Sequence, residues 1–459
     1  MKVQGISNTN YLTYKQLSIK NEKESLDRNY RNKILTLGGA AILGVTLLAC
    51  VLKRKSVLEV DSFKNNLSQR DLNYYNNIIE NLKESGIETN IESLKSIVSP
   101  DEFNKLVRKF KPEHYRAGLQ ISEEKATNIS LKDFYKNAVD GNFRVSLHTH
   151  SNFSDGKATV NEFLECATKY ANKVAKMNKN DGLPPFTIAL TDHDCIEGCC
   201  EIIKIIAQNP DKYKNLKFVA GCEFSVQNGY QHHDITGLAL NPFDKNLNKV
   251  LKELSKERLQ IVDEFLEKQP LYNGKKITRI DVAEFEKKHY TKEGKSGKRC
   301  VENGSGIVAV RHGIKFYYKL IGQDVNHQLV NELGDKKILS IDFVIKSIKD
   351  NGGYASLTHP MKSFWRYIGD EALLKFKDMG IDGIEVNHQY TPSKVTKLGK
   401  INNNINKSDE IFENLTNQYR VFAEKNGLFL SGGTDCHEKQ IFSRQPQITE
   451  EFLNEFILK

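Results

Sequence analysis

The sequence contains eight cysteines but no Cys-x-x-Cys pair with the spacing of a zinc ribbon. This absence argues against a structural zinc site built from cysteines alone. Three cysteines instead adjoin candidate metal ligands, in the segments His193-Asp194-Cys195, Cys222-Glu223 and Asp435-Cys436-His437. Thiols in such positions would oxidise readily in a disulfide-forming compartment. We therefore expect this part of the chain to face a reducing cytosol.

The chain also lacks an alternating basic and aromatic stretch of the kind that binds single-stranded nucleic acid. Its 459 residues carry a formal net charge of +9. A basic balance fits phosphorylated substrates, but it fits an ordinary solvated surface equally well. The length predicts two or more structural units and is ample for a sizeable core.

Charged residues are absent from the nineteen residues 34–52, which basic residues flank on both sides. As a helix this run would span about 28 Å, which is enough to cross the hydrocarbon core of a bilayer. We expect a polar, disordered tail over 1–33, then a single membrane anchor, with the rest of the chain in the cytoplasm. A lipoprotein cleavage box at Leu47–Cys50 and a buried soluble helix are the alternatives.

Residues 56–135 predict a charged helical linker, because apolar residues recur there at three- and four-residue spacing. From residue 143 the pattern changes to short apolar runs separated by helical segments. The first helix would begin at a capping box formed by Thr159 and Glu162. The runs predict seven strands, at 143–147, 186–190, 218–221, 235–240, 354–357, 383–386 and 428–430.

Short buried strands that alternate with helices are typical of a parallel sheet. We therefore predict an α/β fold, a distorted seven-stranded (β/α) barrel whose functional side chains gather at the carboxyl ends of the strands. Residues 241–337 are too many for one connection in such a barrel. They predict a mostly helical insertion above that face.

Ligand-type residues follow most of the predicted strands. His148 and His150 occupy alternate positions at the end of the first strand, so both side chains could reach one metal ion. The candidate metal ligands at this rim are His148, His150, Asp155, His193, Glu223, His232 or His233, His359, Asp435 and His437. One ion takes about four to six ligands, so the set predicts two or three divalent ions. Imidazole mixed with carboxylate favours manganese, iron or zinc.

Ions about 3.5–4 Å apart can share a hydroxide and stabilise an in-line displacement at phosphorus. We therefore predict a metal-dependent phosphoesterase that acts on a nucleotide or a small phosphorylated metabolite. Two other functions are open: a membrane-tethered, catalytically silent metal-binding module, and an exonuclease on the 5′ ends of RNA or DNA. The sequence indicates no protein partner.

The order of these motifs resembles that of the PHP (polymerase and histidinol phosphatase) superfamily over about residues 140–445. The motifs are His148-Thr-His150, Ser154-Asp-Gly156, Thr191-Asp-His-Asp194, Gly221-Cys-Glu-Phe-Ser225, Thr358-His-Pro360, Gly383-Ile-Glu-Val386 and Gly432-Gly-Thr-Asp-Cys-His437. The insertion resembles that of the branch containing nucleoside 3′,5′-bisphosphate phosphatases and RNA 5′-end nucleases.

The resemblance implies three metal positions. The first would use His148, His150, Glu223 and Asp435; the second Glu223, a fourth-strand histidine and His359; the third Asp155, His193 and His437. We assign catalytic roles to His193, Asp435 and His437, with His193, His437 or a water molecule protonating the leaving group. We expect Asp192 or Asp194 to orient His193.

One position departs from the family pattern. Asp234 stands where the family has its fourth-strand histidine. Either Asp234 binds the metal directly, or a one-residue bulge brings in His233, which we prefer. Arg311 in the insertion loosely matches an Arg-x-His element of the branch and is a candidate phosphate contact, and we place His388 on the substrate side.

Overall fold

A central sheet organises the part of the chain that the computed structural model describes: residues 66–115, 143–177, 181–228, 231–290, 298–388, 400, 403–404 and 407–437. Its strands are β1 Val145–Ser146, β2 Phe186–Leu190, β3 Leu216–Asn228, β4 Gln231–Leu238, β5 Leu339–Ser340, β6 Tyr354–Leu357, β7 Gly383–His388 and β8 Phe429–Gly433. Each of the seven predicted runs overlaps one of these strands, although β3, β4, β7 and β8 extend beyond the predicted bounds, and β5 is an addition.

The strands follow the order β1-β2-β3-β4-β6-β7-β8, and β5 pairs with β3 outside this path. Hydrogen bonds from Leu147 N to Gly432 O (2.8 Å) and from Asp435 N to His148 O (2.9 Å) join the last strand to the first. The sheet is therefore a nearly closed barrel, as predicted.

The prediction of an entirely parallel sheet was wrong at β4. This strand runs antiparallel to both of its neighbours, β3 and β6. The reason is the connection: β3 ends at Asn228 and β4 begins at Gln231, and so short a link permits only antiparallel pairing.

Helices cover the outside of the barrel. The predicted capping box at Thr159 and Glu162 opens α7, which ends at Lys176. The helices of this layer are α7 Val160–Lys176, α8 Glu197–Gln208, α14 Ile341–Asp350, α15 Pro360–Phe364, α16 Asp370–Asp378 and α18 Ser408–Lys425.

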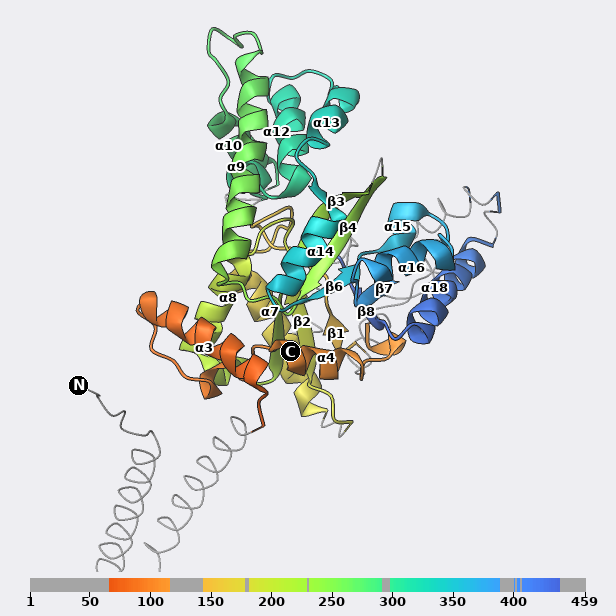
Figure 1. Cartoon of the computed structure of the whole chain (residues 1–459). Coiled ribbons are helices and arrows are strands. Elements are labelled where there is room, and N and C mark those ends of the chain that lie inside the picture. The colour runs from red at the N-terminus through yellow and green to blue at the C-terminus, as the bar shows by residue number, and fades with distance from the viewer. Residues whose placement is uncertain are drawn as a thin grey trace, which may run out of the picture. The chain divides into compact units, whose positions relative to one another are not determined.

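The segment before the barrel is helical, as predicted, but its described part is more than a linker. Its elements are α3 Gln69–Glu84, the short 3₁₀ turns Glu92–Leu94 and Pro112–Tyr115, and α4 Pro100–Val107. Phe103 and Tyr115 join one buried cluster with Val145 and Phe429 of the barrel, and α4 lies beside the lower part of the sheet in Figure 1. Residues 66–115 therefore belong to the core of the domain.

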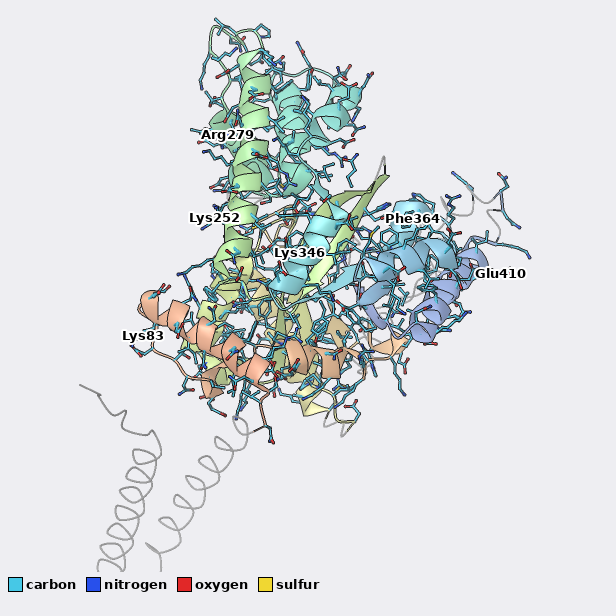
Figure 2. The ribbon with its side chains drawn as sticks, in the orientation of Figure 1. Lys83, Lys252, Arg279, Lys346, Phe364 and Glu410 are labelled. Atoms are coloured by element: carbon cyan, nitrogen blue, oxygen red, sulfur yellow. The ribbon has the colours of Figure 1, made fainter. Side chains whose placement is uncertain are left out.

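The insertion predicted at 241–337 is mostly helical, as expected. It comprises α9 Lys245–Glu267, α10 Arg279–His289, α11 Cys300–Asn303, α12 Gly306–Leu320 and α13 His327–Gly334. These helices enclose a small core of their own that includes Val262, Phe265 and Tyr317. They stand together at the top of Figure 1, and Figure 2 shows Lys252 on the outer side of α9.

The tail at 1–33 and the anchor predicted at 34–52 lie outside the described residues. Within the described ranges, every helix falls short of the length or the apolar character needed to cross a bilayer.

Candidate metal centre

The turn after β1 is tied down by Asp192, which follows β2. Its carboxylate accepts hydrogen bonds from Ser151 N (2.8 Å), Ser151 Oγ (2.6 Å) and Ser154 Oγ (2.6 Å). These bonds fix the chain between His150 and Asp155. Asp192 therefore holds this turn, so of the two residues expected to orient His193, Asp192 and Asp194, it has a different role.

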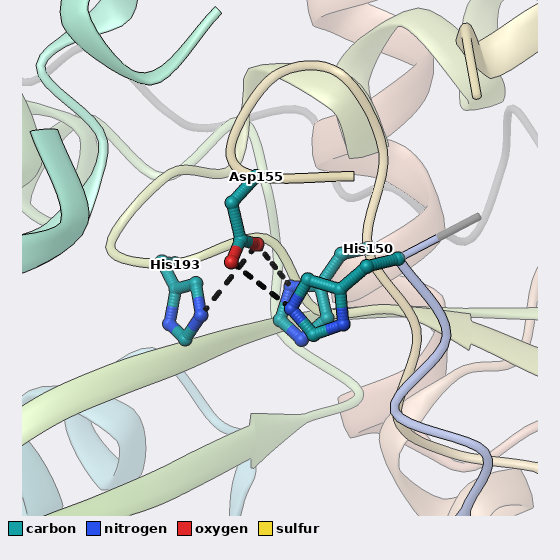
Figure 3. Close-up of side chains that lie close together, drawn as sticks. His150, Asp155 and His193 are labelled. Atoms are coloured by element: carbon teal, nitrogen blue, oxygen red, sulfur yellow. Dashed lines mark ion pairs between the residues drawn. The ribbon is translucent and has the colours of Figure 1, made fainter. Parts of the chain in front are cut away.

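The first ligand group combines His150 and Asp155 with His193 and His437. Asp155 Oδ2 lies 3.0 Å from His437 Nε2, and its Oδ1 lies 3.7 Å from His193 Nε2 and 3.8 Å from His150 Nδ1. Figure 3 shows the carboxylate pointing between the imidazole rings. Among the described residues, the buried atoms His150 Nδ1 and Asp155 Oδ1 make no hydrogen bond. Such atoms, facing each other beyond hydrogen-bond distance, suit a shared cation.

Glu223 lies at the middle of the site. Its Oε2 is 3.1 Å from His148 Nε2, 3.2 Å from His150 Nε2 and 3.2 Å from His193 Nδ1. Its Oε1 is 3.0 Å from His359 Nε2. One carboxylate therefore contacts four imidazoles, which is the arrangement expected of a ligand shared between ions.

Asp435 also contacts imidazoles of the site. Its Oδ1 lies 3.2 Å from His150 Nε2, and its Oδ2 lies 3.1 Å from His388 Nε2. The second ligand group is His148, Glu223 and His359, and the third is His148, His388 and Asp435. His388, which we had placed on the substrate side, thus lies among the candidate ligands.

The charges of the first ligand group suit cation binding. Burial lowers the pKa of His193 and of His437 to about 4, despite the carboxylate of Asp155 beside both. Burial alone would raise the pKa of Asp155, but His437 and His193 hold it well below its ordinary value. Neutral imidazoles and an ionised carboxylate, the forms that bind metal ions, therefore coexist at neutral pH.

His148 depends on Glu385, which lies in the Gly383–Val386 motif but for which we predicted no role from the sequence. Both carboxylate oxygens of Glu385 lie 3.1 Å from His148 Nδ1, and Glu385 Oε2 also accepts a hydrogen bond from His359 N (2.8 Å). This contact orients Nε2 of His148 toward Glu223. The sequence signal that could have identified Glu385 is its position as an acidic residue in the otherwise apolar predicted strand 383–386.

The preference for His233 does not fit the structure. Asp234 pairs with Ser225 and His233 with Val226 in an unbroken register, so the expected bulge is missing from this hairpin. The ring of His233 instead packs 4.7 Å from that of Phe364, whereas Asp234 Oδ2 lies 3.7 Å from His359 Nε2. Burial and the charge of Glu223 raise the pKa of Asp234 to about 7. The side chain of His232 lies outside the described residues.

Arg311 also lies elsewhere. Its guanidinium pairs with Asp335 on the surface of the insertion (2.8 Å), and about a third of the side chain is exposed. A lysine, Lys362, lies beside the ligand groups, with its Nζ 3.3 Å from His359 Nε2 and 3.6 Å from Asp435 Oδ2. No pattern in the sequence distinguishes this lysine from the many others.

The insertion braces the loop that carries His193. Arg258 of α9 and Asp194 are both fully buried and lie 3.0 Å apart. Asp194 has a positive φ of 44°, a strained conformation that this ion pair and a hydrogen bond to Glu223 O help to maintain. Asp194 therefore anchors the His193 loop to α9.

Comparison with known proteins gives one clear sequence match. No family model matches the chain. A 3′,5′-nucleoside bisphosphate phosphatase from Chromobacterium violaceum is 24% identical over 302 residues, which cover 64% of this chain and 87% of that protein. This match agrees with the resemblance drawn from the motifs.

Two solved structures are more distant. A protein from Bifidobacterium adolescentis classed as a metal-dependent phosphoesterase is 18% identical with a TM-score of 0.41, covering 68% of this chain and 95% of that one. A two-domain protein from Bacteroides vulgatus with a PHP-like metal-dependent phosphoesterase is 12% identical, with a TM-score of 0.27. The match covers 64% of this chain and 52% of that one. TM-scores of this size do not establish a common fold.

Proposed function

Because this chain belongs to the PHP superfamily, we propose that it is a metal-dependent phosphoesterase that hydrolyses a phosphate ester of a nucleotide. The proposal rests on one observation, which is that the three ligand groups share residues or contact the same residue. His148 belongs to two of the ligand groups, and Glu223 contacts members of all three. Neighbouring ions held by shared ligands suit displacement at phosphorus better than a single isolated ion.

We assign three metal positions to the residues present. One is His150, Asp155, His193 and His437; the second is His148, Glu223 and His359, with Asp234 beside them; the third is His148, His388 and Asp435. The family resemblance implies a different first position, made of His148, His150, Glu223 and Asp435. That set is the alternative, because His150 Nε2 lies 3.1 Å from His148 Nε2 and 3.2 Å from Asp435 Oδ1. When bound, divalent ions would lower the pKa of a water molecule and stabilise the phosphoryl oxygens. The donor set suits manganese, iron or zinc.

The protein's own groups would bind and orient the substrate. The ammonium group of Lys362 lies within 3.6 Å of Asp435 and is placed to pair with a phosphate oxygen. His193 and His437, with a pKa of about 4, are neutral near pH 7 and are better metal ligands than acids. We therefore propose that a solvent water, and neither histidine, protonates the leaving oxygen.

We propose a nucleoside bisphosphate as the substrate, in line with the curated relative. In the insertion, Lys298 Nζ lies 4.7 Å from the ring centroid of Tyr290, and the charge of Lys298 contributes to the low pKa of Asp155. The insertion thus brings a cation and an aromatic ring toward the site. Such a pair suits a second phosphate and a nucleobase.

The test uses the full-length protein supplied with Mn²⁺. Phosphate release from adenosine 3′,5′-bisphosphate is compared with nucleotide release from a short 5′-phosphorylated RNA. The double variant His148→Ala, His150→Ala should lose turnover, while His327→Ala, a change at an exposed histidine, should keep it. Faster turnover of the RNA would favour the exonuclease, and metal binding without turnover of either substrate would favour the silent module.

We retain the membrane anchor at residues 34–52, with the enzyme domain in the cytoplasm, as a separate proposal. Its support is the uncharged run of nineteen residues between basic flanks. Fractionation of cells that express the full chain, or the chain without residues 1–55, tests it. Equal amounts of both forms in the membrane fraction would contradict the proposal.

A further inference from the structure

Three helices of the insertion bring a carboxylate, a thiol and an imidazole together. The residues are Glu286 of α10, Cys300 of α11 and His312 of α12, and one ligand atom from each lies within 4.8 Å of the others. Glu286 and Cys300 are fully buried, and the side chain of His312 is 13% exposed. None of the three belongs to the ligand groups of the barrel.

The hydrogen bonds of this cluster leave lone pairs that could bind a cation. Glu286 Oε1 lies 2.6 Å from His312 Nδ1, and Oε2 accepts a hydrogen bond from Val301 N (2.9 Å). Each carboxylate oxygen has two lone pairs, so one on each remains available. The sulfur of Cys300 donates to Ser154 O (3.1 Å), a bond that a thiolate would give up.

Two aromatic rings pack against His312. The ring of Phe316 lies 5.3 Å from that of His312, and the ring of Tyr290 stacks at 6.2 Å. Burial raises the pKa of the Cys300 thiol well above its ordinary value, so the thiolate needs a neighbouring cation. A buried carboxylate likewise needs compensation, which a divalent ion gives more completely than a single imidazole.

We propose that Glu286, Cys300 and His312 bind one transition-metal ion of the zinc class. Thiolate, imidazole and carboxylate together form a set typical of zinc. The ion would join α10, α11 and α12 into one unit. Asn303, at the end of α11, donates a hydrogen bond to Phe153 O (2.9 Å), so the ion would also fix the insertion against the barrel rim.

Cobalt gives a test that separates this site from the barrel. Co²⁺ bound by a thiolate absorbs in the near ultraviolet by charge transfer, and cobalt bound only by imidazole and carboxylate does not. The barrel groups contain no cysteine. The full-length protein loaded with Co²⁺ should therefore show the band, and the double variant His148→Ala, His150→Ala should keep it even if it loses all activity.

The variant Cys300→Ser should lose the band together with one bound ion per chain. Cys166→Ser, at a half-buried cysteine in α7, should keep both. Glu286→Gln and His312→Gln should weaken cobalt binding at least about 10-fold by titration, and circular dichroism verifies that each variant is folded. Absence of the band in the wild-type protein, or a band that survives Cys300→Ser, would overturn the proposal and leave a hydrogen-bonded trio.

Discussion

The barrel rim and the insertion each gather imidazole and carboxylate, but they do so by different means. At the rim, His148 and His359 follow β1 and β6, and Glu223 lies within β3, so the topology of the sheet brings them together. In the insertion, Glu286, Cys300 and His312 come from three helices whose packing decides whether they meet. The comparison shows that side chains which meet at the ends of strands can be predicted from sequence, whereas side chains which meet between packed helices cannot.

The two regions also differ in how many contacts each ligand makes. At the rim Glu223 contacts four imidazoles, whereas in the insertion Glu286 contacts one. A change at the rim should therefore affect several ions, and a change in the insertion only one. The predictions that follow test this difference, from the largest expected effect to the smallest.

The largest effect is expected for Glu223→Gln. The amide of glutamine lacks the negative charge that the four imidazoles and their ions require. The rate of phosphate release should therefore fall by more than about 100-fold, and the protein should lose more than one bound metal ion per chain. Glu257→Gln, at a half-exposed surface pair with Lys337, is the matched control. Loss of a single ion only would show that Glu223 is not shared.

The junction between the two regions depends on the buried pair of Arg258 and Asp194. Asp194→Asn leaves the guanidinium buried without its counter-charge, and the free energy of unfolding should fall by about 3–5 kcal/mol. Asp335→Asn, which breaks the exposed pair with Arg311, should lower it by less than about 1 kcal/mol. Urea unfolding of the metal-free protein measures both, and equal losses would contradict the bracing role of Arg258.

Glu385→Gln should act through His148. The variant keeps the size of the side chain but weakens the contact that orients the imidazole, so metal affinity should fall by about 10–100-fold. Glu371→Gln, on the exposed side of α16, should leave the affinity unchanged. Manganese titration of the two proteins gives the comparison, and equal affinities would remove Glu385 from the site.

The metal-free protein should lose stability as pH falls from about 6.5 to 4. Burial lowers the folded-state pKa of His193 and His437 to about 4 from an ordinary 6.5, so the unfolded chain binds more protons across this window. The stability that these groups contribute is present above pH 6.5 and is lost toward pH 4. His437→Asn should make the decline shallower in thermal unfolding, and an unchanged slope would contradict the shifted pKa.

The smallest effect separates Asp234 from His233. Asp234→Asn should lower manganese affinity by about 10-fold, because this carboxylate lies beside His359. His233→Ala should leave the affinity unchanged, since its ring packs against Phe364 outside the ligand groups. The reverse result would restore the ligand that the sequence favoured.

The sequence predicted the parts of the site that alternate along strands or follow them. His148 and His150 could be placed because strand geometry puts alternate side chains on one face. The same rule could not choose between His233 and Asp234, because the register of β4 was not known from the sequence. Glu385 and Arg258 were missed because each acts through a partner more than 25 residues away in the chain. Lys362 lies only three residues from His359, but its second partner, Asp435, is also distant in the chain. Long-range packing of this kind leaves no periodic signal.

The measurement that tests the central claim most directly is a titration of metal-free protein with Mn²⁺, following bound metal and phosphate release from adenosine 3′,5′-bisphosphate together. Ligands shared between ions predict little turnover at one ion per chain and a steep rise as further ions bind. Full turnover at one ion per chain would contradict a site that works through neighbouring ions.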